Sequence, residues 1–251
     1  MIADPWFYVL AVPAILLVGI SKVGFGGGLG VLAVPMMAIV VAPPTAAAVM
    51  LPILCVMDLI GVWAYRRSFD LANLRIMVPA AILGIGFGAL TFGYMDQAMI
   101  RILIGLIAVI FTLNYWLGGK SAAEARGRNR IKGSFWSAVS GFTSFLAHAG
   151  GPPVNVYLLP QRMDMTLFVG TKVVFFIIVN YVKLIPYAWL GQLHAGNLAT
   201  SLVLIPLAPV GVGLGLWLHR RIDNELFYRI CYVILFLVGI RLLYDGVSDL
   251  L

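Results

Sequence analysis

Charged residues are scarce in this chain: they make up 11% of its 251 residues, whereas 62% are apolar. A soluble domain typically has about 25% charged and about 45–50% apolar residues. The longest polar stretch, residues 118–133, has only the length of a loop, which excludes a separate soluble domain. Several apolar runs approach the ~20 residues that a helix needs to cross a bilayer. The composition therefore predicts an all-α integral membrane protein.

Cysteine and histidine are also rare, which excludes several kinds of site. Cys55 and Cys231 both fall inside apolar runs, so a disulfide framework is excluded. His148, His194 and His219 fall in different segments, and no histidine–glutamate helical motif occurs. An intramembrane enzyme needs a metal cluster or a nucleophile with its base. We therefore predict that the protein is not an enzyme and has no metal and no cofactor.

Acidic residues are fewer than basic ones, and the formal net charge is +7. The basic residues gather in short stretches between apolar runs, chiefly residues 118–133 and 66–75. Such clusters mark the cytoplasmic loops of membrane proteins. We therefore expect the lipid bilayer to be a partner and nucleic acid not to be one. Residues 1–6 contain no Lys or Arg, unlike a cleaved signal peptide, so the first helix is expected to stay in the mature protein.

Ten apolar segments form two groups of five on either side of the basic stretch. They cover residues 5–20, 27–42, 45–65, 74–95 and 98–118, then 134–147, 151–160, 166–190, 198–218 and 226–247. We predict an N-terminal repeat over residues 1–118, a basic cytoplasmic linker over 119–133 and a C-terminal repeat over 134–251.

The two halves share unusual residues in register. At one constant offset, Pro79, Gly84, Gly86, Gly88 and Asp96 recur as Pro206, Gly211, Gly213, Gly215 and Asp223. With small gaps, further matches are Gly19 with Gly141, Pro35 with Pro160, Asp58 with Asn180, and Asn73 with Asn197. The spacing of Gly84 and Gly88, like that of Gly211 and Gly215, predicts close helix packing without chemistry. The pattern as a whole predicts a duplicated fold.

Placing the basic linker in the cytoplasm fixes the sidedness of the rest. The loop 66–75 then also lies inside, whereas the loop 94–97, without Lys or Arg, and both termini lie outside. The halves become inverted repeats if residues 5–42 and 134–160 form broken helical hairpins. The hairpin arms are about 10–16 residues long, so the hairpins either turn near mid-membrane or cross fully. Each half then adds three transmembrane helices, giving about eight to ten membrane segments.

A rival arrangement treats each broken stretch as one crossing. It gives eight helices in parallel repeats with both termini inside, but it places Arg220 and Arg221 outside. The inverted arrangement keeps these basic residues inside and is therefore favoured.

Glycine-rich breaks interrupt the apolar runs at matching places in the two halves. The first, residues 24–30, follows Lys22, and the second, residues 148–153, begins with His148. Irregular backbone inside a membrane needs surrounding protein or a water-filled cavity, and paired broken helices point to a transporter's binding site. Backbone N–H groups at helix starts attract anions. The breaks predict an anion site, with close helix packing as the alternative explanation of the glycines.

Residues 166–190 carry two lysines in an apolar run. Lys172 and Lys183 are eleven residues apart, about three turns, so they share a face, with Asn180 nearby. Ionisable residues inside a span usually face a cavity and mark a pathway. Lys172, near the inner end, is also placed to extend to the interface instead.

Asp58 is a carboxylate well inside segment 45–65. It is placed to form an ion pair with Lys22 or Lys183, or to take up a proton, since an isolated buried carboxylate is neutral. Asp58 and His148 are the candidates for proton coupling. The residues predicted to bind substrate are Lys22, Gly26, Gly27, Gly28, His148, Gly150, Gly151, Asn155, Thr171, Lys172, Asn180 and Lys183.

The motifs at the breaks and in the lysine segment closely resemble a known family. They are Gly26-Gly27-Gly28, the run from His148 to Val154 (HAGGPPV), and Gly170-Thr171-Lys172 followed by Asn180 and Lys183. They resemble the TauE/SafE family of sulfite exporters and related sulfur-anion permeases, and the duplication with its basic central loop is similar too. The resemblance implies mostly outward, proton-coupled transport of sulfite, sulfonates, sulfoacetate, thiosulfate or related small anions across a bacterial cytoplasmic membrane. Asp58 has no counterpart in that pattern, so its role rests on this sequence alone.

The sequence thus predicts an inner-membrane exporter of small sulfur-containing oxyanions. A permease for another small anion is one alternative. A membrane assembly factor without transport is another, although it would need neither buried lysines nor broken helices. The sequence leaves open which anion moves, its direction, and whether the protein forms a homo-oligomer.

Overall fold

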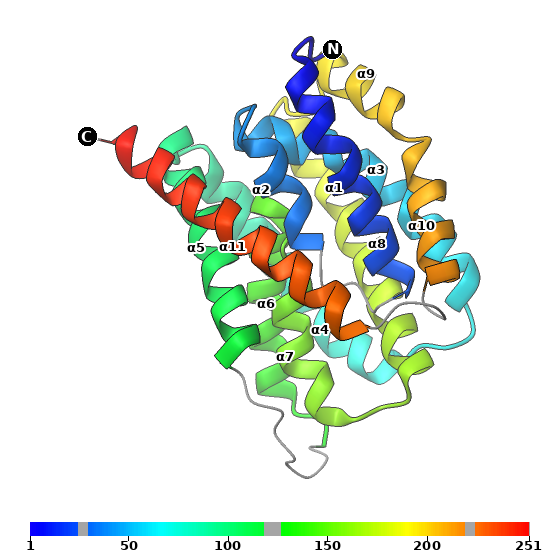
Figure 1. Cartoon of the computed structure of the whole chain (residues 1–251). Helices are drawn as coiled ribbons and strands as arrows, with labels where there is room; N and C mark the ends of the chain where they lie inside the picture. Colours follow the sequence, from blue (N-terminus) through cyan, green and yellow to red (C-terminus); the bar gives the residue numbers. More distant parts are fainter. Residues whose placement is uncertain (25–29, 118–126, 219–223, 251) are drawn as a thin grey trace.

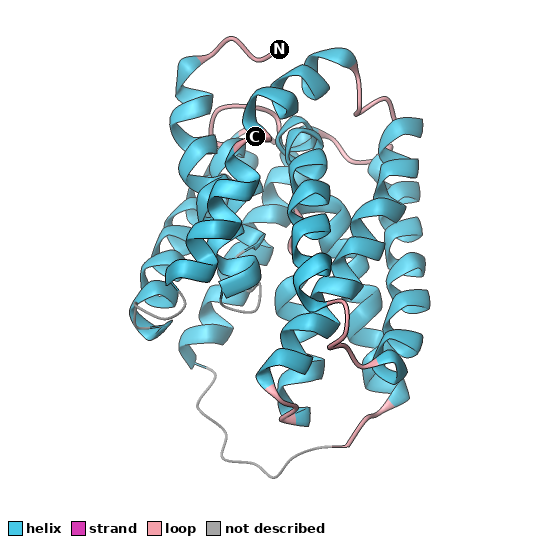
Figure 2. Ribbon diagram, turned by 90° about the vertical axis from the view of Figure 1, so that its right-hand side faces the viewer, coloured by secondary structure: helices cyan, strands magenta, loops and turns pink. Residues whose placement is uncertain are grey.

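The computed structural model describes residues 1–24, 30–117, 127–218 and 224–250. Within these ranges every regular element is a helix, as predicted (Figures 1 and 2). The first half contains α1 (Pro5–Gly24), the short 3-10 helix η1 (Gly30–Leu32), α2 (Ala33–Ala38), α3 (Pro43–Tyr65), α4 (Leu71–Phe92) and α5 (Gln97–Leu117). The second half contains α6 (Arg130–Ala147), α7 (Gly151–Leu158), the 3-10 helix η2 (Leu159–Gln161), α8 (Met165–Trp189), α9 (Ala195–Leu204), α10 (Leu207–Leu218) and α11 (Asn224–Ser248).

Polar caps set several helix starts. The Asp70 side chain accepts hydrogen bonds from two backbone N–H groups of the first turn of α4, and Asp164 does the same for α8. Asn129 accepts one from the backbone N–H of Lys132, so α6 begins at Arg130. Residues 130–133, which the sequence assigned to the linker, are therefore helical.

Within the part of the chain that the structure describes, five helices are long and apolar enough to cross a membrane, namely α1, α3, α4, α5 and α8. The predicted single segment 198–218 is instead divided into α9 and α10, which would form a sixth span bent by 43°. Pro206 lies in this break, where its missing N–H and its ring interrupt the helix. The predicted eight to ten segments included the arms α2 and α7, which extend only about 9–12 Å along their axes.

Each broken stretch turns back on itself (Figure 1). Helix α1 runs inward from the end that carries both termini, and α2 returns toward that end. Helix α6 runs inward from the opposite end, where α5 finishes, and α7 returns there. The described residues thus have two hairpins that approach the middle of the bundle from opposite ends.

Close packing joins helices of different halves, chiefly α4 with α6, α1 with α10, α5 with α11, and α3 with α8. A Cβ atom at Gly211 would lie 3.3 Å from the Cα atom of Gly19, and one at Gly84 would overlap the backbone of Ala138. The other two glycines of the predicted packing faces are equally close to a neighbouring helix, namely Gly88 and Gly215. The predicted role of these glycines in close packing is confirmed.

Helix α3 lies at the centre of the bundle and α5 at its edge. In α3, 67% of the apolar membrane-spanning stretch is buried, whereas in α5 only 33% is buried. Helix α3 packs on α8, and Asp58 of α3 is buried, as are Lys172 and Lys183 of α8.

Candidate functional site

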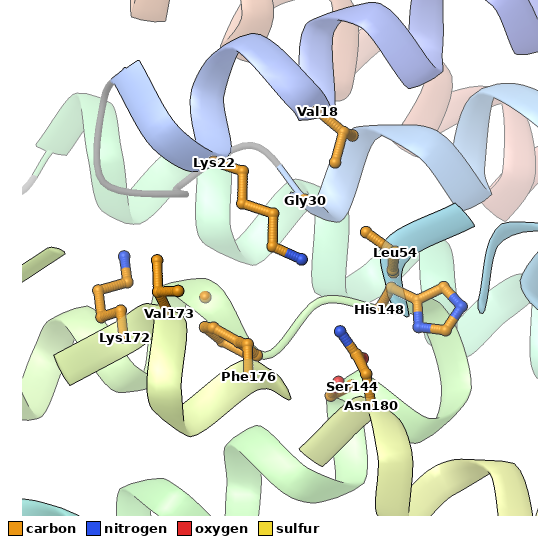
Figure 3. A pocket seen from close by; sticks show the side chains of 11 residues that line it. Val18, Lys22, Gly30, Leu54, Ser144, His148, Lys172, Val173, Phe176 and Asn180 are labelled. Carbon is orange, nitrogen blue, oxygen red and sulfur yellow. The ribbon is translucent and has the colours of Figure 1, made fainter. Parts of the chain in front are cut away.

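A small cavity of about 40 Å³ lies where the two hairpins meet (Figure 3). Gly30, the last residue of the first break, and Gly151, which lies in the second break and begins α7, both line it. Five residues predicted to bind substrate are among its walls: Lys22, His148, Gly151, Lys172 and Asn180. The cavity thus brings five of the predicted residues together in one place.

On one side of the cavity, Asp58 is held between two donors. Lys22 Nζ lies 2.6 Å from Asp58 Oδ1, and Asn180 Nδ2 donates to Asp58 Oδ2 at 2.6 Å. The Asp58 side chain is fully buried, and that of Lys22 is 11% exposed. Of the two pairings open to Asp58, the structure has the one with Lys22. Both carboxylate oxygens therefore face donors.

On the other side, Lys183 makes three hydrogen bonds without a carboxylate. Its Nζ donates to His148 Nδ1 at 2.7 Å and to Ser144 O and Ser144 Oγ at 3.0 Å each. His148 Nε2 lies 2.9 Å from Ala47 O, and a carbonyl oxygen can only accept. His148 therefore carries its hydrogen on Nε2 and is neutral, while all three N–H bonds of the Lys183 ammonium are used.

The second break is fixed by polar side chains of α6. His148 adopts the left-handed conformation with φ of 53°, which ends the helix. Thr143 Oγ1 donates to Ala149 O at 3.1 Å, and Ser140 Oγ donates to Gly150 O at 2.8 Å. Carbonyl groups of the irregular backbone are thus satisfied without water, as a membrane interior requires.

Helix α7 offers few backbone donors to a ligand. Its second and third residues, Pro152 and Pro153, have no N–H group, so only Gly151 of the first three residues has one. Backbone N–H groups therefore contribute less at this break than the sequence led us to expect. The corresponding prediction for the first break, at Gly26, Gly27 and Gly28, falls outside the described residues.

Lys172 is buried and points into the protein rather than toward the interface. Its Nζ donates to Asn155 Oδ1 at 2.7 Å and lies 5.0 Å from the centre of the Phe168 ring. Asn155 thus stands behind the cavity wall, where it holds Lys172. Thr171 is elsewhere, because its hydroxyl donates to Leu167 O at 2.6 Å and accepts from the Asp70 N–H at 2.8 Å.

Sequence reasoning missed Ser144, which lines the cavity and binds Lys183. The repeat could have found it. Ser144 follows Lys22 by the same 122 residues that separate Asn180 from Asp58 and Gly141 from Gly19. The position of the first-half lysine is therefore occupied by a serine in the second half.

Positive charge exceeds negative charge around the cavity. Lys22 lines it and Lys183 lies behind its lining residues Ser144 and His148, and among the described residues the Asp58 carboxylate is paired with only one of these two lysines, Lys22. Lys172 brings a third ammonium group to the wall. Buried charges are costly unless they are paired, so an excess of buried positive charge is an arrangement that favours an anion. Among the residues that the structure describes, no group of three His, Cys, Asp or Glu side chains gathers to hold a metal ion.

Similarity to known proteins agrees with this geometry. The family described as Sulfite exporter TauE/SafE matches residues 11–242 of the 251, which include both breaks and the lysine segment. No protein of curated function and no solved structure matches the chain. Proteins of this family are membrane exporters of sulfite or related sulfur anions and not enzymes. The resemblance read from the motifs is confirmed over nearly the whole length, and the chain belongs to the TauE/SafE sulfite exporter family.

Proposed function

We propose that this protein exports sulfite or a similarly small sulfur oxyanion across the bacterial inner membrane, with the anion bound in the cavity between the two hairpins. The observation that carries the proposal is the excess of positive charge around this enclosed cavity, where Lys22 reaches the wall and Asp58 balances only part of the charge. Lys183 adds positive charge from behind Ser144 and His148. Asn180 and Ser144 supply hydrogen bonds.

The size of the cavity favours the smallest candidates. A water molecule needs about 10–15 Å³ by this measure, so 40 Å³ has room for about three water-sized groups. Sulfite, with one sulfur and three oxygens, suits this space. A sulfonate with an organic chain would need the wall to open, for instance at Phe176.

The halves are proposed to be inverted repeats whose axis passes between α3 and α8. Asp58 and Asn180 occupy equivalent positions in the two repeats, and they bond to each other at 2.6 Å. Residues that meet their own equivalents lie on a two-fold axis. The same two-fold axis would also make the packing of α1 on α10 equivalent to the packing of α6 on α4. Alternating access would then come from rocking one repeat against the other.

Asp58 is proposed to couple transport to protons by competing with the substrate. In the structure its carboxylate occupies Lys22 and Asn180, two groups that an oxyanion would need. A proton on Asp58 removes its charge and frees both donors for the substrate. When the anion leaves, Asp58 loses the proton and binds Lys22 again. One proton would then move outward with each anion, so the anion's own gradient would drive export and an inward proton gradient would oppose it.

Other titratable groups face Asp58 from the elements packed around it. They are Lys22 on α1, Cys55 on α3, and Lys183 and Tyr181 on α8. His148 is the poorer proton carrier, since its Nδ1 already accepts from Lys183 and its Nε2 already faces Ala47 O.

Efflux of radiolabelled sulfite from proteoliposomes tests the function. Wild-type protein should release sulfite faster than empty vesicles. Lys22→Gln should lower the rate at least about tenfold, because removing a buried ammonium group that binds the anion costs about 1.4 kcal/mol or more. Lys132→Gln, an exposed lysine outside the cavity, is the matched control. Equal rates for Lys22→Gln and wild type, or equal transport of an organic carboxylate, would contradict the proposal.

A further inference from the structure

A second hollow lies far from the central cavity, at the end of the bundle where α4 and α6 begin. It has a volume of about 580 Å³ and shares no lining residue with the central cavity. Arg75 of α4, Arg130 of α6 and Arg128 just before α6 line it together with apolar residues such as Pro79 and Leu83. A hollow of this size is far too large for sulfite alone.

Polarity changes along the hollow in the way it changes across a membrane surface. Arg75, Pro79 and Leu83 are spaced by four residues, so they lie on one face of α4, with Leu83 about 12 Å from Arg75 along the axis. The charged end is at the helix start, and Leu83, which is 74% exposed, lies deeper along a membrane-spanning helix. The apolar part therefore faces hydrocarbon, while the arginines lie at the level of lipid headgroups.

Contacts within the protein bring the three arginines to the same hollow. Arg128 Nη2 donates to both carboxylate oxygens of Asp70, at 2.9 Å and 3.2 Å, and Asp70 itself caps α4. This contact ties the segment before α6 to the start of α4 and brings Arg130 and Arg75 to the same hollow. None of the described lining residues is acidic, so three guanidinium groups face the single nearby Asp70 carboxylate.

The geometry assigns this hollow to an acidic phospholipid. The phosphate would lie between Arg75 and Arg130, because the planar guanidinium group binds phosphate oxygens in pairs. An acyl chain would lie along Pro79 and Leu83. Basic pockets between membrane helices bind acidic headgroups in this way. The apolar lining distinguishes a lipid from a soluble phosphate, which would have no use for it.

Lipid titration of the delipidated full-length protein tests this assignment. Native mass spectrometry would measure binding of phosphatidylglycerol and of phosphatidylcholine with the same acyl chains. We expect one saturable phosphatidylglycerol site with weaker phosphatidylcholine binding. Arg75→Gln and Arg130→Gln should each weaken phosphatidylglycerol about fivefold, and together about 25-fold. Neither substitution touches the central cavity, so sulfite binding should be unchanged.

Matched controls separate this site from general attraction to basic residues. Arg67→Gln and Lys132→Gln remove equally exposed charges at the same end of the bundle but outside the hollow, and both should bind phosphatidylglycerol like wild type. Leu83→Gln should weaken the lipid but not glycerol phosphate. The assignment is wrong if the arginine variants bind the lipid normally, if the controls weaken it as much, or if inorganic phosphate alone displaces it.

Discussion

Lys22 and Lys183 are both close to one cavity but have different kinds of partner. Lys22 is paired with the Asp58 carboxylate, whereas Lys183 donates only to groups on Ser144 and His148. Under the proposed mechanism, the first arrangement would exchange its internal anion for an external one, while the second would keep its partners throughout. The comparison teaches that two buried lysines beside one cavity need not have equivalent roles.

The largest effect is expected on stability, when Lys22 is replaced while Asp58 remains. Lys22→Met leaves a buried carboxylate without its counter-ion, which is expected to destabilise the protein by about 3–5 kcal/mol. The double variant Lys22→Met with Asp58→Leu removes both charges and should recover most of that stability without recovering sulfite transport. Thermal unfolding in detergent measures the first effect and proteoliposome efflux the second. A single variant as stable as wild type would show that the pair is not buried as described.

The substitution Asp58→Asn is expected to strengthen anion binding, whereas loss of Lys22 weakens it. The amide keeps the shape of the side chain but cannot compete with an anion for Lys22, so binding should become about tenfold tighter if about 1.4 kcal/mol of competition is removed. In the wild type, binding should strengthen as the pH falls, because protonation of Asp58 frees Lys22; in the variant this dependence should vanish.

Thiosulfate is the suitable probe for Asp58→Asn, since its own charge does not change from acid to neutral pH. Calorimetric titration of wild type and variant over that range would give both results. Retained pH dependence in Asp58→Asn would remove Asp58 from the coupling mechanism.

Substitutions of His148 test the role of the contact between His148 and Lys183. His148→Asn places an amide oxygen where Nδ1 accepts from Lys183, and asparagine tolerates the left-handed backbone of this position. We expect it to keep transport within about threefold and to keep the pH dependence. His148→Ala loses the acceptor and strains the turn, costing about 1–3 kcal/mol. Efflux assays at two pH values separate the cases; loss of pH dependence in His148→Asn would make His148 the proton carrier.

The smallest effect is expected outside the cavity, at Asp70. Partial burial raises the pKa of Asp70, but hydrogen bonds from the backbone of Asn73 and from Arg128 outweigh it and hold the pKa below its ordinary value of 3.8. A depressed pKa contributes stability that is present above the ordinary pKa and lost as the pH falls through the folded-state value. Asp70→Asn should therefore lower stability by about 1 kcal/mol near neutral pH and less in acid. Thermal unfolding at both pH values checks this difference.

Much of the fold and of the site was readable from the sequence because the signals were local. Apolar runs marked the helices, and lysines inside them marked the cavity wall. The pairing of Asp58 with Lys22 rather than Lys183 was not readable, because it depends on where α1 crosses α3 in space. The division of α9 from α10 was missed because Pro206 was read only as a repeat marker. Thr171 was assigned to the site by its motif, but its rotation about α8 directs it to Asp70 instead.

The two prolines that open α7 have a consequence for selectivity. With two amide donors missing from the first turn, few fixed directions are imposed on the oxygen atoms of a guest. An ammonium group is a point charge and imposes no fork of directions either. Under the proposed function, discrimination would then depend on total charge and on volume: pyramidal and tetrahedral ions of similar size would be admitted alike, while neutral molecules and bulkier ions would be turned away.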